Sequence, residues 1–83
     1  MRRNREELFE ILVREHRLAL LAFVRACVYD RGAAEDLVQE TFLAAWEHLD
    51  EYDEDSPFAR WLRGIARNKI LAYYRAAATT APP

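Results

Sequence analysis

The sequence predicts an all-α domain of three helices, and three observations support this class. Only two glycines occur, and the prolines stand at positions 57, 82 and 83, so two long stretches contain no helix breaker. Apolar residues recur with helical spacing, whereas the clean alternation and the Asn-Gly or Asp-Gly turns of β-hairpins are missing from the sequence. At 83 residues and 52% hydrophobic composition, the chain suits one small folded domain.

The first helix is expected over residues 4–29. Asn4 followed by Glu7 is the pattern of a capping box. The sequence YDRG then interrupts the helical pattern, and Gly32 is the expected stop. Because the single Cys27 falls in the apolar pattern, we expect a buried thiol without a disulfide. The apolar residues that follow the helical period are Leu8, Leu12, Ala19, Phe23 and Cys27, with Ile11, Leu18, Leu21 and Val24 widening their stripe.

The second helix is expected over residues 33–49, with Glu35 and Asp36 near the positive end of its dipole. Its buried side would carry Val38, Phe42, Ala45, Trp46 and Leu49. The opposite side combines a leucine with polar and acidic residues, namely Asp36, Gln39, Glu40, Leu43 and Glu47. An apolar residue ringed by carboxylates is typical of a surface that binds a basic protein partner. A solvated face with one stray leucine fits equally simply.

The third helix is expected over residues 57–78, after the polar loop 50–56. Ser56 suits the N-cap and Pro57 the first helical position. The sequence TTAPP at 79–83 would begin a linker, which leaves residues 1–78 as the domain. The expected buried face of this helix consists of Phe58, Trp61, Leu62, Ile65, Ala66 and Tyr73.

The charges divide sharply along the chain. Residues 1–56 hold all 14 acidic residues and seven basic ones, a net charge of −7, whereas residues 57–83 hold five basic residues and no acid, a net charge of +5. Arg60, Arg63 and Arg67 lie within about 60° of one another around the third helix. Leu71 and Tyr74 extend this patch, and Asn68 and Arg75 border it. Such a surface is typical of nucleic-acid binding, although a basic solvated helix is the alternative.

The sequence gives little support to catalysis. Ser56 is the only serine, and His16 and His48 lack a cysteine or acidic neighbour at metal-ligand spacing. A glycine-rich phosphate loop is also missing from the sequence. We therefore predict that the protein is not an enzyme and needs neither a cofactor nor a metal ion. The N-terminus lacks the apolar run of a signal peptide and the chain lacks a membrane span, so the cytoplasm is the expected location. Binding of the basic segment to a membrane surface is a weaker alternative.

Two segments, AEDLVQETFLAAW and SPFARWLRGIARNKILAYYR, resemble region 2 of bacterial sigma factors of the extracytoplasmic-function (ECF) group. The resemblance covers about residues 5–76 and implies a three-helix domain that binds RNA polymerase core and promoter DNA. An anti-sigma factor is a further candidate partner. Members of this family normally continue into a region 4 that reads the −35 element; this chain stops where the linker would begin, so we expect −35 recognition to be absent. The alternative is a helical interaction domain that binds polymerase or a regulator without recognising DNA.

The resemblance also assigns roles to single residues. Those expected to dock on the clamp helices of the polymerase β′ subunit are Asp36, Gln39, Glu40, Leu43 and Glu47. Those expected to recognise the −10 element and help melt it through the non-template strand are Arg60, Trp61, Arg63, Arg67 and Asn68. The loop expected to hold a flipped base contains Tyr52, Asp53, Ser56 and Phe58. For Trp61 and Phe58, core packing is favoured over direct base contact, because both lie on the apolar stripe.

Three departures from the family pattern produce further expectations. Ala33 replaces a frequent acidic cap, which predicts a weak start for the second helix. Gly64 replaces a larger residue, at a cost of about 0.5–1 kcal/mol of helix stability, and would let DNA or another helix approach closely. The loop before the third helix is strongly acidic and would repel phosphates, so we hypothesise that it meets base edges instead. Its acidic residues are Asp50, Glu51, Asp53, Glu54 and Asp55.

Overall fold

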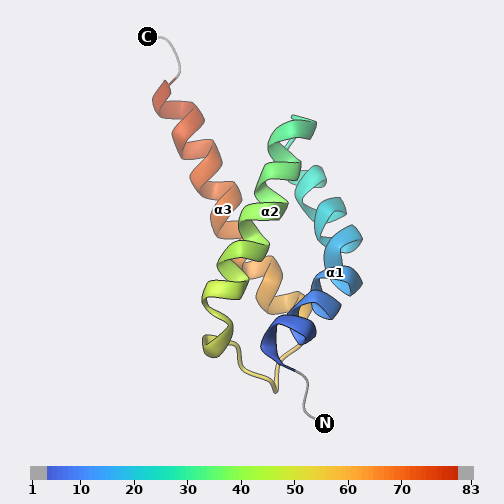
Figure 1. Cartoon of the computed structure of the whole chain (residues 1–83). Coiled ribbons are helices and arrows are strands. Elements are labelled where there is room, and N and C mark those ends of the chain that lie inside the picture. The colour runs from blue at the N-terminus through green and yellow to red at the C-terminus, as the bar shows by residue number, and fades with distance from the viewer. Residues whose placement is uncertain (1–3, 81–83) are drawn as a thin grey trace.

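The computed structural model describes residues 4–80, which form three α-helices and one short 3₁₀ helix (Figure 1). Helix α1 spans Arg5–Cys27, α2 spans Arg31–Glu47, η1 spans Leu49–Glu51 and α3 spans Phe58–Thr80. No strand occurs in this part of the chain, and the all-α, three-helix prediction is confirmed. Ala81–Pro83, the rest of the expected linker, lie outside the described residues.

Helices α1 and α2 both begin at side-chain caps. The Oδ1 atom of Asn4 accepts a hydrogen bond from the Glu7 backbone N–H at 2.8 Å, as the capping-box pattern predicted for this end. Helix α2 starts earlier than expected, because Asp30 Oδ1 accepts from the Ala33 N–H at 2.9 Å. Gly32 therefore lies in the first turn of α2 instead of ending α1. The prediction of a weak start was wrong, because the acidic cap stands three residues before Ala33.

Helix α3 differs from its prediction by one or two residues at each end. Its first backbone hydrogen bonds run from the N–H groups of Arg60 and Trp61 to the carbonyl oxygen of Pro57. The hydroxyl of Ser56 instead donates to the Asp53 carbonyl oxygen at 3.3 Å, so the expected Ser56 cap was wrong. Thr79 and Thr80 continue the helix beyond residue 78, where the linker was expected to begin.

One hydrophobic core joins all three helices. Thr41 of α2 is fully buried, and its hydroxyl donates a hydrogen bond to the Leu37 carbonyl oxygen at 2.7 Å, so this buried polar group has a partner. The buried apolar residues are Leu20, Val24 and Val28 from the α1 segment, Ala34, Leu37, Val38, Phe42 and Ala45 from α2, and Phe58, Leu62, Ala66 and Ile70 from α3. The predicted buried face of α3 is thus largely confirmed.

The predicted buried face of α1 was partly wrong. Leu8 and Leu18 are 48% and 79% exposed, and Cys27 is exposed instead of buried. Val24 is buried as predicted, whereas the other buried residue, Leu20, was not predicted and lies roughly a quarter of a turn from the centre of the row Leu8, Leu12, Ala19, Phe23 and Cys27. Leucines occur on more than one side of α1, and a helix in a three-helix bundle buries only one stripe.

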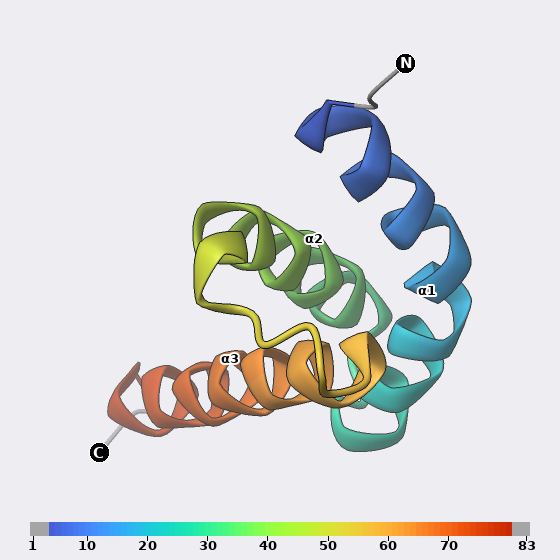
Figure 2. The same ribbon diagram turned by 90° about the horizontal axis from the view of Figure 1, so that it is seen from below.

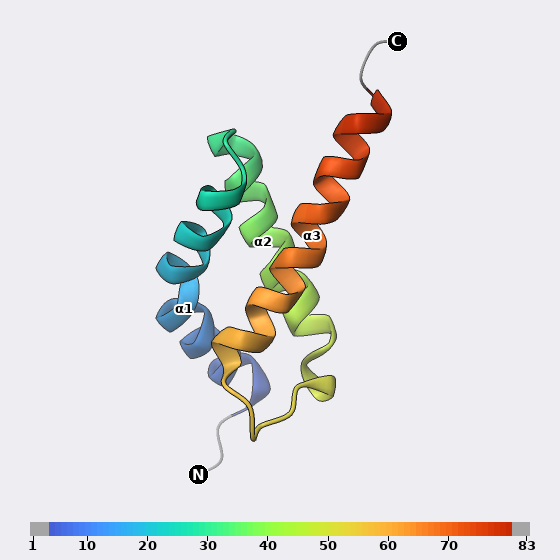
Figure 3. The ribbon, with the colours of Figure 1, turned by 180° about the vertical axis from the view of Figure 1, so that it is seen from behind.

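The helices are arranged so that α1 and α2 lie side by side while α3 crosses both (Figures 2 and 3). The segment between α2 and α3 lies at the bottom of the bundle in Figure 1 and therefore faces the viewer in Figure 2. The C-terminal half of α3 diverges from α2 and projects from the bundle (Figure 3). The hydroxyl of Tyr74 donates to the Cys27 carbonyl oxygen and ties this half to the end of α1. None of the described helices is long and apolar enough to cross a bilayer.

Candidate functional site

The outward side of α2 carries the five residues expected to bind polymerase, here called the α2 stripe: Asp36, Gln39, Glu40, Leu43 and Glu47. All five are exposed, and Leu43 is 62% exposed. Within residues 4–80, none of the three carboxylates forms an ion pair. The helix therefore presents an apolar side chain among unpaired negative charges, as the helical spacing of these residues predicted.

A groove between α1 and α2 runs along one side of this stripe. It has a volume of about 500 Å³, and Gln39 and Leu43 belong to its wall. At one end, the ring of Phe9 contacts that of Trp46 with centroids 5.2 Å apart, and the Arg5 guanidinium lies 5.5 Å from the Trp46 ring. The full lining is Phe9, Val13, Arg17, Val38, Gln39, Phe42, Leu43 and Trp46. A helical wheel of α2 alone could not identify the α1 residues, because it does not show which neighbour packs beside it.

Helix α3 carries the second set of charges. Arg60, Arg63 and Arg67 are exposed on one side of the helix, here called the basic face. No ion pair links any of them to another residue of the described part of the chain. Leu71 and Tyr74, each 46% exposed, continue this face toward the projecting end of α3. The face therefore offers several unpaired guanidinium groups beside an aromatic ring.

The other two expected DNA residues, Trp61 and Asn68, lie on a different side of α3. They line a groove of about 370 Å³, here called the η1 groove, between α3 and the end of α2 with η1. Its full lining is Ala44, His48, Glu51, Trp61, Ile65, Asn68 and Lys69. The five predicted residues thus form two neighbouring sites, an open basic face and a groove that combines an indole ring with amide and ammonium donors.

The expected flipped-base loop is held by its own side chains. Tyr52 donates from its hydroxyl to the Ser56 carbonyl oxygen at 2.6 Å, and its ring contacts Phe58 edge-on at 5.4 Å between centroids. Asp53 Oδ1 accepts from the Asp55 N–H at 3.0 Å. Phe58 is only 7% exposed and belongs to the core, as the packing interpretation expected. Trp61 packs against the same core and contacts the Tyr52 ring at 5.1 Å, yet it also lines the η1 groove.

A hydrogen-bond contact at the edge of the η1 groove was not predicted. His48 Nδ1 lies 2.5 Å from Glu51 Oε2, and both side chains are largely exposed. The sequence analysis considered neighbours of His48 only as metal ligands and did not predict this contact with Glu51. The spacing of three residues across a helical turn, readable in the sequence, was the available signal. Among the described residues, no group of three or more potential ligands surrounds this pair to form a metal site.

Comparison with known proteins identifies the family. The family model described as Sigma-70 region 2 matches residues 12–80, which include all of α2 and α3. The chain belongs to the sigma-70 region 2 family. No solved structure gives a significant match.

The curated relatives indicate that this region 2 domain is of the ECF type. RNA polymerase sigma factor CnrH of Cupriavidus metallidurans is 42% identical over 67 residues, which cover 81% of this chain and 35% of that protein. ECF RNA polymerase sigma factor SigL of Mycobacterium tuberculosis is 38% identical over 71 residues, covering 84% and 40%. For ECF RNA polymerase sigma factor SigM of Bacillus subtilis, the values are 42% over 53 residues, 64% and 32%. This region 2 chain therefore spans about a third of the length of these relatives.

Proposed function

We propose that this domain acts in transcription initiation by binding RNA polymerase core and promoter DNA in the cytoplasm. The α2 stripe would contact the clamp helices of the β′ subunit. Leu43 would be the apolar anchor, and the surrounding carboxylates would meet basic residues and set the register. The exposure of Leu43 and the unpaired carboxylates support this assignment, because a solvated face needs no leucine at its centre.

Promoter binding would use both sides of α3. Arginines of the basic face would neutralise phosphates of the non-template strand at the −10 element, which fixes the position of the strand without reading its sequence. Trp61 and Asn68 in the η1 groove would receive a base by stacking and hydrogen bonding. Extruding a base costs a few kcal/mol, and these contacts would offset that cost during melting. The η1 groove, with the loop of Tyr52 and Phe58 behind it, is the candidate base site.

One observation carries the proposal: two exposed faces of opposite charge lie on different helices, and neither is neutralised within residues 4–80. A domain that bridges an acidic polymer and a basic protein surface requires this separation. A domain that binds only a protein partner requires the α2 stripe alone, and this alternative does not account for the basic face.

The DNA-binding half of the proposal is tested by mixing the domain with polymerase core and a −10 non-template oligonucleotide. Replacement of Arg63 and Arg67 by alanine should weaken capture of the oligonucleotide by about tenfold or more, because two phosphate contacts are lost. Arg25→Ala, an exposed arginine of α1 outside the predicted sites, is the matched control. Equal capture by both variants would favour the domain that binds polymerase without DNA.

The core-binding half is tested separately. Leu43→Ala and Glu40→Ala should each weaken binding to polymerase core while the far-UV helical signal stays unchanged, because both side chains are exposed. Arg63→Ala/Arg67→Ala should bind core as the wild type does. Normal core binding by both α2 variants would contradict the assignment of the α2 stripe.

A further inference from the structure

A small hollow between α1 and α3 borders the basic face. Its lining includes His16 of α1 and Arg63 of α3, and its other residues are uncharged, namely Ala19, Leu20, Ala59 and Leu62. The hollow has a volume of about 30 Å³. This is more than the roughly 10–15 Å³ that one water molecule needs. The hollow therefore has room for one water-sized group, such as a single oxygen atom of a phosphate.

The imidazole ring of His16 is held by two contacts with the protein. Its Nδ1 atom lies 2.8 Å from the Leu12 carbonyl oxygen, and the ring meets the Phe58 ring edge-on with centroids 5.1 Å apart. Because a carbonyl oxygen only accepts hydrogen bonds, Nδ1 carries a hydrogen and donates it. Nε2 forms no hydrogen bond within residues 4–80, where no buried side-chain nitrogen lacks a partner, so Nε2 reaches solvent. Nε2 is therefore the nitrogen available to a ligand.

The protonation state of His16 decides what Nε2 offers to that ligand. In the neutral ring with hydrogen on Nδ1, Nε2 is an acceptor and cannot bind a phosphate oxygen. In the charged ring, Nε2 also carries a hydrogen and is a donor. Histidine is the side chain whose charge ordinarily changes between about pH 5 and 8. A phosphate contact at His16 therefore requires the protonated ring.

The charged groups around His16 favour an anion as the ligand. Across the hollow, α3 contributes Arg63, which forms no ion pair within residues 4–80. Glu15 and Arg17, the exposed neighbours of His16 on α1, lie about 100° to either side of it by helical spacing. Helix α2 contributes no charged group to the lining of this hollow. An anion in the hollow would therefore lie between the Arg63 guanidinium and the His16 ring.

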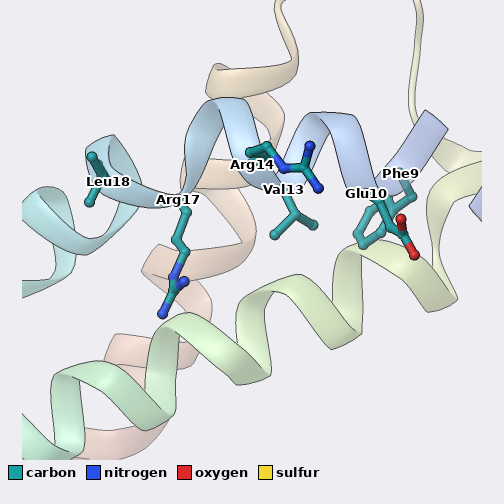
Figure 4. Close-up of a pocket in the computed structure, with 6 residues that line it drawn as sticks. All are labelled: Phe9, Glu10, Val13, Arg14, Arg17 and Leu18. Atoms are coloured by element: carbon teal, nitrogen blue, oxygen red, sulfur yellow. The ribbon is translucent and has the colours of Figure 1, made fainter. Parts of the chain in front are cut away.

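The arginines of α1 nearest to His16 lie on another side of the helix. Arg14 and Arg17 line a different hollow of about 480 Å³, and Figure 4 shows Arg17 extending from α1 toward α2. By helical spacing, both lie about 100° or more around α1 from His16. His16 is thus the residue of α1 that shares a hollow with the basic face and can gain a positive charge there.

We infer that His16, in its protonated form, is a phosphate contact of the DNA-binding surface. This inference rests on the proposed function and adds a residue of α1 to a surface so far assigned to α3. The Nε2–H group of His16 and the Arg63 guanidinium hold one phosphate oxygen of the non-template strand between them. Ala19 and Ala59 line the same hollow, and their small side chains let the phosphate approach.

Binding of the strand is thereby linked to the uptake of a proton. Because the phosphate stabilises the charged ring, the protonated domain binds the strand more tightly than the neutral domain does. Reciprocally, the bound strand favours protonation of His16. The affinity for DNA should therefore rise as the pH falls through the range in which His16 gains its proton, and one more phosphate should be contacted at low pH.

The test measures binding of the −10 non-template oligonucleotide to the domain in complex with RNA polymerase core, at about pH 6 and about pH 8. The wild type should bind about three- to tenfold more tightly at the lower pH. Its slope of log affinity against log salt concentration should be steeper there by up to about 0.7, the value for one phosphate of a single strand. His16→Gln should lose both differences. His16→Arg, which is charged at both pH values, should show the steeper slope at both.

A matched control is available because the chain contains one other histidine, His48. Whatever its affinity, His48→Gln should keep the steeper slope at low pH. Far-UV circular dichroism establishes that the helices persist in each variant. NMR titration of the His16 ring in the wild-type domain needs no substitution: its midpoint should move to higher pH when the oligonucleotide is bound.

Different results identify which statement fails. If the wild type binds with the same affinity and slope at both pH values, or if His16→Gln keeps the differences, the inference is overturned while the proposed function stands. If His16→Gln does not fold, the NMR titration decides, and an unchanged midpoint overturns the inference. If Arg63→Ala/Arg67→Ala captures the oligonucleotide as the wild type does, the DNA-binding half of the proposed function fails and this inference fails with it.

Discussion

The α2 stripe and the basic face of α3 are alike in exposure and opposite in charge, but their surroundings differ. The α2 stripe borders the groove between α1 and α2, whose lining is mostly apolar. The basic face is the open side of a helix whose C-terminal half projects from the bundle (Figure 3). The stripe is therefore one edge of a concave surface, and the basic face is a convex one.

This difference matches two kinds of partner. A concave surface buries apolar area against a folded helix, which has a shape of its own. A convex row of arginines suits a flexible, charged strand that can bend around it. The small η1 groove beside this row has room for one base at a time. The two faces thus differ in the shape of partner they suit as well as in charge.

The largest expected effect separates the buried side of α2 from its exposed side. Leu37→Ala should lower the free energy of unfolding by about 2–5 kcal/mol, because Leu37 is 5% exposed in the core. Leu43→Ala should change the free energy of unfolding by less than about 0.5 kcal/mol while weakening binding to RNA polymerase core. Urea denaturation measures both values. A large destabilisation by Leu43→Ala would mean that the α2 stripe contributes to the hydrophobic core of the domain. The stripe would then not be an exposed binding surface comparable with the basic face.

The next effect concerns the acidic loop between the two faces. Asp53→Asn/Glu54→Gln/Asp55→Asn should reduce the preference of the domain for cytosine in the −10 oligonucleotide, because a carboxylate that accepts from the cytosine amino group discriminates by about 1–3 kcal/mol. Asn at position 53 keeps an oxygen for the Asp55 N–H, so the loop should retain its shape. Competition between oligonucleotides that differ at one base measures the preference. A uniform rise in affinity for all bases would show that the loop is only repulsive.

A smaller effect tests whether the three arginines of the basic face act together. Arg60→Ala, Arg63→Ala and Arg67→Ala should each reduce the slope of log affinity against log salt concentration by about 0.7, the value for one phosphate of a single strand. Oligonucleotide binding at several salt concentrations gives the slopes, with Arg25→Ala as the control. An unchanged slope for one arginine would remove that residue from the strand contact.

The sequence predicted most accurately where one local pattern dominates. Proline at 57 and apolar residues on a single side made the start and buried face of α3 readable to within a few residues. Helix α1 has leucines on several sides, and only packing against α2 and α3 decides that Leu20 is buried while Leu18 is exposed. Cys27 was expected to be buried and is exposed for the same reason, since packing between helices decides its burial.

The candidate sites show the same division. The α2 stripe and the basic face each follow from the spacing of residues on one helix, so both could be predicted as surfaces. The two grooves need side chains from two elements, such as Phe9 with Trp46 or His48 with Trp61, and no single helical wheel contains that information. The roles of these residues in binding stay predictions.

The smallest expected effect concerns Gly64, which lies between the two sites of α3. By helical spacing it falls between Arg60 on the basic face and Asn68 in the η1 groove. A Cβ atom there would meet nothing within 4 Å, so none of the described part of the chain requires a glycine at this position. Gly64→Ala should therefore raise the free energy of unfolding by about 0.5–1 kcal/mol, measured by urea denaturation.

The same variant tests how the strand passes from one site to the other. A strand that contacts Arg60 and places a base beside Asn68 must cross α3 at Gly64, where the missing side chain allows its backbone to come close. Gly64→Ala should then weaken binding of the −10 oligonucleotide even as it stabilises the helix, and Gly64→Leu should weaken it further. If both variants gain stability and bind the oligonucleotide normally, the strand does not cross at Gly64, and the basic face and the η1 groove are not used by one strand along this path.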